Sequence, residues 1–73
     1  MKNISEGQQR AIDGCEDIYE VEDELTGWGL EWYEEYSFNF QGKRYGFMLV
    51  DSGKADDSQC GNYPEVTDLK EIK

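Results

Sequence analysis

Residues 11–42 of this 73-residue chain read AIDGCEDIYEVEDELTGWGLEWYEEYSFNFQG and contain two periodic patterns, the first helical and the second typical of strands. The segment holds ten acidic residues and no Lys or Arg. The rest of the chain carries seven acids and seven bases, so the formal net charge of −10 belongs to this segment alone. The ten acids are Asp13, Glu16, Asp17, Glu20, Glu22, Asp23, Glu24, Glu31, Glu34 and Glu35.

The first half of the segment, residues 11–25, has the spacing of an amphipathic helix. Acids at i, i+3, i+4, i+7 and i+11 fall on one stripe, and apolar residues fall on the opposite face, with Glu22 as an exception inside the apolar arc. The stripe consists of Asp13, Glu16, Asp17, Glu20 and Glu24. The apolar face consists of Ala11, Ile12, Cys15, Ile18 and Tyr19, with Leu25 at its margin.

The ends of this helix are also marked in the sequence. Ser5 and Gln8 have capping-box spacing, which starts the helix near Ser5, and Thr26-Gly27 provides a stop. Gly14 weakens the helix by roughly 1 kcal/mol relative to Ala, so a break near it stays open. A strand over residues 18–25 is the rival interpretation, but it would place Ile18 on the same face as three glutamates.

An acidic stripe on one helix destabilises that helix. Six pairs of acids lie three or four residues apart, and at roughly 0.2–0.5 kcal/mol each they cost on the order of 1–3 kcal/mol. Asp23 and Glu24 lie at the end where the helix dipole favours cations. A surface that needs only solubility mixes both signs of charge, so the stripe favours a binding role.

From Trp28 the period changes from 3.6 to 2. Aromatic and apolar residues alternate with polar ones through Phe40, with Glu34 as an exception that marks a bulge or bend between two shorter strands. Gln41-Gly42 predicts a two-residue hairpin turn. This turn pairs the residues so that the aromatic face of each strand lies on the same side: Phe38 faces Tyr45, Tyr36 faces Phe47 and Asn39 faces Arg44.

The remaining segments complete the predicted fold. Residues 1–4 form a short arm, and the Gly-, Asp-, Ser- and Asn-rich residues 52–64 form a long loop. Residues 66–72 form a final edge strand, with a short helical turn as the alternative. The fold class is α+β, with one N-terminal amphipathic helix packed on a small antiparallel sheet of about three strands, in a single domain spanning residues 1–73.

The composition argues against an enzyme, a metal site and a cofactor. The chain lacks His, which removes the commonest general base and metal ligand. A calcium-loop pattern starting at Asp56 fails because its twelfth position is Thr67. Cys15 is interpreted as a buried reduced thiol, with a single disulfide bridge between Cys15 and Cys60 as the alternative. We expect no catalytic residues, no metal and no cofactor.

The charge also argues against direct nucleic-acid binding, because such proteins neutralise phosphates with a basic surface. The start of the chain lacks the apolar core of a signal peptide, and the longest apolar run, residues 47–50, is too short to span a membrane. We expect a cytoplasmic protein, in the host cytoplasm if the chain is viral, with no membrane contact.

The leading hypothesis is that the acidic surface mimics a nucleic acid and blocks the basic nucleic-acid-binding site of another protein. In charge and size, though not in any motif, the chain is similar to small acidic inhibitors that phages and mobile elements direct against DNA- or RNA-processing and defence enzymes. Alternatives are an antitoxin or immunity protein against a basic nuclease, a solvated acidic face, and a subunit that assembles, as a homodimer for example, through its aromatic sheet face. The expected partner-binding residues are Asp13, Glu16, Asp17, Glu20, Asp23, Glu24, Glu31, Glu34, Glu35 and, as an aromatic anchor, Tyr33.

Overall fold

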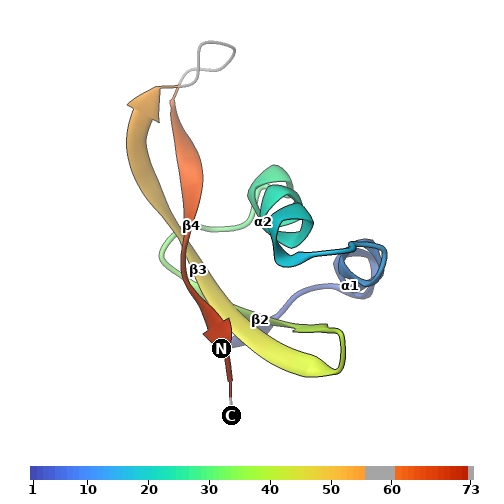
Figure 1. The fold of residues 1–73 in the computed structure, drawn as a ribbon. Helices are drawn as coiled ribbons and strands as arrows, with labels where there is room; N and C mark the ends of the chain where they lie inside the picture. Colours follow the sequence, from blue (N-terminus) through green and yellow to red (C-terminus); the bar gives the residue numbers. More distant parts are fainter. Residues whose placement is uncertain (56–60, 73) are drawn as a thin grey trace.

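The computed structural model describes residues 1–55 and 61–72 and confirms the α+β class. Figure 1 shows both helices on one side of a twisted sheet whose strand order is β1-β2-β3-β4. The elements are β1 (Lys2–Asn3), α1 (Glu6–Asp13), α2 (Ile18–Gly27), β2 (Glu35–Phe40), β3 (Lys43–Ala55) and β4 (Asn62–Glu71). The prediction of one helix and about three strands is therefore wrong in detail, since the described residues form two helices and four strands.

The predicted continuous helix is broken between Gly14 and Asp17. Gly14 caps the C-terminus of α1: its backbone N–H donates to the carbonyl of Arg10, and the N–H of Cys15 donates to the carbonyl of Ile12. Asp17 is extended (φ −143°, ψ 174°) and caps the N-terminus of α2 by accepting a hydrogen bond from the backbone N–H of Glu20. The helix can break here because the new helix ends have partners for their backbone groups. Gly14 lies at the C-cap of α1, and the Asp17 side chain accepts from a free N–H at the start of α2. The predicted capping box of Ser5 and Gln8 is confirmed at the start of α1.

We predict that Asp17→Ala lowers the free energy of unfolding by about 1 kcal/mol, because it removes the side-chain acceptor that caps α2. Asp23→Ala is the matched control: it removes the same charge from the same helix, but Asp23 does not cap the helix. Urea denaturation followed by circular dichroism measures both variants. Equal losses of stability in the two variants would contradict the capping role of Asp17.

The predicted hairpin is confirmed with its register. β2 and β3 pair antiparallel, with Phe38 opposite Tyr45, Tyr36 opposite Phe47 and Asn39 opposite Arg44. Gln41 and Gly42 both have positive φ, 51° and 78°, as a type I′ hairpin turn requires. The ring pairs Tyr36–Phe47 and Phe38–Tyr45 are stacked, with centroids 5.7 and 5.5 Å apart.

The segment between α2 and β2 was predicted as a strand from Trp28, and this prediction is wrong. Residues 28–34 are irregular: Gly29 and Tyr33 have positive φ values of 69° and 63°, which lie outside the extended region of a regular strand. The backbone N–H of Tyr33 donates to the carbonyl of Leu49, which holds this loop against β3. Trp28, Leu30 and Trp32 are half-buried and pack against the core from the loop.

β3 and β4 form a hairpin much longer than predicted. The loop expected over residues 52–64 is instead strand up to Ala55 and again from Asn62. The strand predicted over residues 66–72 is confirmed as part of β4 up to Glu71. Residues 51–55 and 62–65 extend beyond the helices as a projecting arm (Figure 1). The register between the two strands shifts near Asp68, whose φ is 56°, as in a β-bulge.

The start of the chain, predicted as an arm, is a strand. β1 pairs parallel to β2, with Lys2 opposite Tyr36 and Asn3 opposite Ser37, so the sheet is mixed rather than antiparallel. Beyond the end of β1, the side-chain amide of Gln9 bonds the free edge of β2. Its Nε2 donates to the carbonyl of Asn39 (2.7 Å), and its Oε1 accepts from the N–H of Asn39 (3.0 Å). Gln9 thus pairs with the outer side of β2 as a strand residue would.

Both outer strands of the sheet are protected against pairing with another chain. At one edge β1 is only two residues long, and Gln9 covers β2 where β1 ends. At the other edge β4 carries a proline, a bulge and several charged residues, and all of these features discourage edge-to-edge association. The core lies between the helices and the sheet and is formed by Ile12, Val21, Leu25, Tyr36, Phe38, Phe40, Phe47 and Leu49. Within the described residues, neither helix is long and apolar enough to cross a membrane.

Candidate functional site

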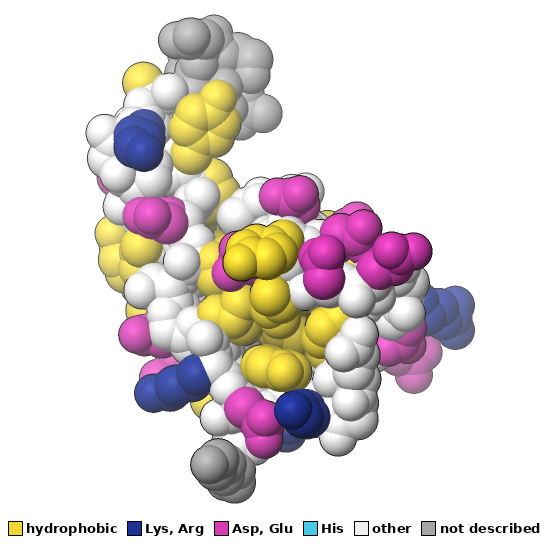
Figure 2. All heavy atoms as spheres, in the orientation of Figure 1, with side chains coloured by type: hydrophobic (Ala, Val, Ile, Leu, Met, Phe, Trp, Pro, Cys, Tyr) yellow, Lys and Arg dark blue, Asp and Glu magenta, His cyan; other side chains and the backbone are white. Residues whose placement is uncertain are grey.

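The exposed acids of α1, α2 and their linker form one surface, which we call the acidic face. Figure 2 shows magenta side chains gathered over α2 and the linker. The break between the helices does not disperse these residues, because the linker is short and α1 and α2 lie side by side. The acidic face consists of Asp13, Glu16, Asp17, Glu20, Asp23 and Glu24, all exposed.

The described bases, including Arg10 on α1, form no ion pair with the acidic face. The ion pairs found in this part of the chain join Lys2 to Glu31 and Glu34, and Lys43 to Glu71. Arg44 turns to the other side of the sheet and donates to Asn3 Oδ1 and Ser37 Oγ. The field of the six carboxylates is therefore directed to solvent.

Two carboxylates of the acidic face also stabilise the local backbone. Asp17 caps α2, and Glu20 Oε2 accepts a hydrogen bond of 2.7 Å from the backbone N–H of Glu16. Both lie at the helix N-terminus, where the dipole favours negative charge. The repulsion between acids that was expected for a single continuous helix is also reduced. Of the six pairs of acids three or four residues apart, only Glu20–Asp23 and Glu20–Glu24 lie within one helix. Asp23 and Glu24 have no such compensation, because the last turn of α2 holds no base.

Cys15 lies beneath the acidic face and responds to its charge. The half-buried thiol donates to the carbonyl of Ala11 (3.3 Å). Burial raises the pKa of Cys15, and the carboxylates of Glu24, Glu20 and Asp17 raise it further. The negative charges of these three carboxylates thus all disfavour the thiolate form of Cys15. The other cysteine, Cys60, lies outside the described residues.

We predict that the thiol of Cys15 is alkylated at a higher pH in the folded protein than in the urea-unfolded chain, because only the thiolate reacts and its pKa is raised by folding. The same shift makes the free energy of unfolding decrease as pH rises from the unfolded to the folded pKa. Iodoacetamide rates against pH, in a Cys60→Ser background, measure the effect. Glu20→Gln with Glu24→Gln should move the folded profile to lower pH; an unmoved profile would mean that these charges do not act on Cys15.

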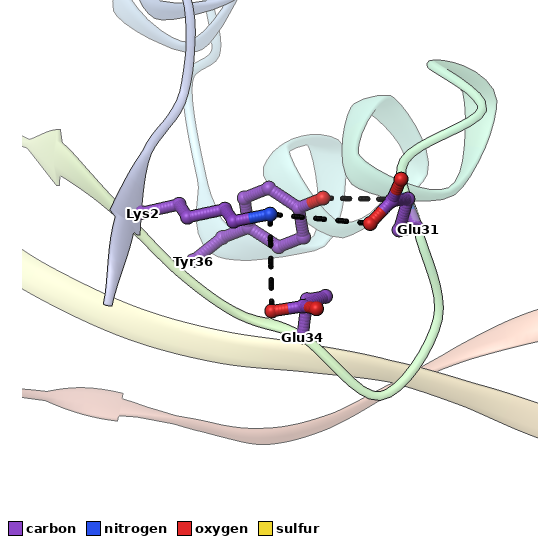
Figure 3. A network of polar contacts seen from close by, with 4 residues as sticks. All are labelled: Lys2, Glu31, Glu34 and Tyr36. Atoms are coloured by element: carbon purple, nitrogen blue, oxygen red, sulfur yellow. Dashed lines mark hydrogen bonds and ion pairs between the residues drawn. The ribbon is translucent and has the colours of Figure 1, made fainter.

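Four of the predicted site residues lie apart from the acidic face. Figure 3 shows Lys2 between Glu31 and Glu34, at 3.9 Å from each, while the backbone N–H of Glu31 donates to the hydroxyl of Tyr36. Glu35 begins β2 opposite Met48, and Tyr33 is 64% exposed in the loop before β2. Lys2 therefore partly neutralises this group, and the structure does not bring it together with the six acids of α1 and α2.

Tyr19 is the residue that sequence reasoning misplaced. It was predicted on the buried face of a single helix, but it is 75% exposed on α2, among the acids. The core is instead contacted by Val21 and Leu25, which are fully buried. A second helix that begins after Asp17 predicts this arrangement, because Ile18, Val21 and Leu25 then lie at i, i+3 and i+7 on one face.

The described residues hold no group of three or more Asp, Glu, Cys or His side chains that would bind a metal ion. The calcium-loop pattern considered above begins at Asp56, outside the described residues. Comparison of this chain with protein-family models, with curated proteins and with solved structures gives no match. The function is therefore argued from the acidic face alone.

Proposed function

We propose that this protein is a non-catalytic inhibitor whose acidic face occupies the basic nucleic-acid-binding site of another protein. The observation that carries the proposal is the group of six exposed carboxylates on α1, α2 and their linker, which make no ion pair with the described bases. Such a surface attracts a cationic cleft over a distance of about 8–10 Å at moderate ionic strength.

The spacing of charge on α2 supports nucleic-acid mimicry. Asp17, Glu20, Asp23 and Glu24 are exposed along the helix. With a rise of about 1.5 Å per residue, they cover about 10 Å. The mean separation along the axis is then about 3.5 Å, close to the roughly 3.4 Å between charges on one strand of duplex DNA. A cleft that binds a row of phosphates therefore meets a similar row of carboxylates.

Tyr19 supplies an aromatic anchor within this row. Exposed tyrosines are frequent among the residues that contribute most to binding, and the ring face attracts Arg and Lys side chains. This assigns to Tyr19 the role that sequence reasoning gave to Tyr33. The alternative of assembly through the aromatic sheet face is not favoured, because Tyr36, Phe38, Phe40 and Phe47 are buried beneath the helices.

Competition with nucleic acid tests the proposal. The chain is immobilised, basic proteins are captured from lysate at low salt and eluted at high salt, and each purified candidate is bound to labelled DNA or RNA. We expect the acidic protein to displace the labelled nucleic acid stoichiometrically and less efficiently as salt increases. A partner that binds this chain and its nucleic acid at the same time would contradict mimicry. An immunity protein would instead inhibit one nuclease at its catalytic centre.

A further inference from the structure

A groove separates the projecting arm from the C-terminal end of α2, away from the acidic residues at the start of that helix. Figure 2 shows the surface indented between the arm and α2. The groove has a volume of about 560 Å³. It is lined by Thr26, Gly27, Gly29, Trp32, Asn62, Tyr63 and Pro64.

The C-terminal end of α2, which forms one wall of the groove, carries a partial negative charge. The final carbonyls of a helix carry the negative end of its dipole, and α2 has no base in its last turn. Gly27 and Gly29 have no side chains, and an added Cβ would meet no atom within 4 Å at either position. The backbone at this helix end is therefore accessible to a hydrogen-bond donor.

The opposite wall is hydrogen-bonded to a carboxylate. Asn62 Nδ2 donates to both carboxylate oxygens of Asp51, at 2.9 and 3.1 Å. Within the described residues, Asp51 takes part in none of the ion pairs. Asp51 does not line the groove, but it pairs with Pro64 across the strands and is bonded to Asn62, and both of these residues do line it. Its carboxylate also accepts from the backbone N–H of Gly53 (2.8 Å) and keeps its negative charge, which favours a cation on this side of the groove.

Aromatic rings complete the lining. Tyr63 is 48% exposed on the arm and Trp32 is half-buried in the loop before β2. The face of Trp or Tyr attracts a cation, and Arg is the residue found there most often. A planar guanidinium also presents five N–H donors, which suits a site that combines carbonyl acceptors with ring faces.

We propose that this groove binds an arginine side chain of the basic partner, beside the row of carboxylates that the partner's cleft covers. The inference rests on the proposed function for the identity of the partner, but the chemistry of the groove is tested separately. The groove adds specificity, because it requires one arginine at a defined distance from the cationic cleft, whereas the acidic face requires only positive charge.

Titration with N-acetyl-arginine amide, followed by ¹H–¹⁵N NMR of the whole chain, tests the groove. We expect saturable shifts of the backbone signals of Gly27, Gly29 and Tyr63 and of the Trp32 indole N–H. The neutral isostere N-acetyl-citrulline amide should bind at least about fivefold more weakly than the arginine amide, since it lacks the cation. Equal shifts from both ligands, or shifts confined to residues 13–24, would overturn the proposal.

Two variants that add the same charge sharpen the test. Thr26→Lys places a cation at the helix end and should weaken arginine-amide binding about fivefold by competition. Thr67→Lys adds a cation on β4 opposite Met48 and should leave binding within about twofold.

Tyr63→Ala, at a half-exposed position, removes a ring and should weaken binding without unfolding the chain. Equal binding by all three variants would contradict the groove site, whereas failure of nucleic-acid displacement alone would contradict only the proposed function.

Discussion

Asp23→Lys combined with Glu24→Lys is expected to weaken partner binding by about a hundredfold or more, because each reversal replaces an attraction in the interface by a repulsion. These two acids are chosen because they have no capping role, unlike Asp17 and Glu20. Lysines near the C-terminus of α2 also interact favourably with the helix dipole. The free energy of unfolding should therefore be unchanged or higher, and the loss of binding would not reflect misfolding.

The control for this prediction is Glu65→Lys combined with Glu71→Lys on β4. It changes the net charge by the same amount, and both positions are exposed. Because Glu71 pairs with Lys43 (3.8 Å), circular dichroism first checks that this variant is folded. Displacement of labelled DNA or RNA from the partner measures both double variants at two salt concentrations. We expect the β4 variant to retain displacement within about tenfold, since only long-range steering is reduced. Equal losses in the two variants would indicate that net charge, and not the acidic face, determines binding.

Phe38→Ala is expected to unfold the protein or to lower its free energy of unfolding by about 3–5 kcal/mol. Phe38 is only 1% exposed, stacks on Tyr45 and contacts Phe47 in a tilted arrangement. A chain of this length is stable by roughly 4–11 kcal/mol in total. The cavity left by this one ring therefore removes a large share of the stability.

Urea denaturation compares Phe38→Ala with Tyr19→Ala, which truncates an aromatic side chain at an exposed position. The Tyr19 variant should stay within about 0.5 kcal/mol of the parent protein. Phe38→Leu retains part of the volume and should lie between the two. A small effect of Phe38→Ala would mean that the helices do not depend on this ring for their packing on the sheet.

The parts of the fold that the sequence predicted correctly depend on local signals. The β2–β3 hairpin follows from the alternation around Gln41-Gly42, and the start of α1 follows from the spacing of Ser5 and Gln8. The break between the helices was missed because the acidic spacing continues across it. A signal was nevertheless present, since Asp17 and Glu20 repeat the spacing of an N-cap and its N3 acid.

Other features have no local signal. β1 comprises two residues and acquires its structure only by pairing with β2 more than thirty residues later. The loop before β2 alternates as a strand does, yet Tyr33 adopts a positive φ that its residue type does not indicate. In the candidate site, the exposure of the acids was predictable from charge. The exposure of Tyr19 was not, because it depends on where the second helix begins.

The two-point pairing of Gln9 with Asn39 links positions thirty residues apart. During translation, residues 2–9 leave the ribosome well before residues 35–40, so β1 and α1 emerge without the strand that completes them. A short helix is marginal in water on its own. The N-terminal segment is therefore expected to order only after the β2–β3 hairpin has been synthesised, and the acidic face, which includes residues of α1, to assemble only after that hairpin.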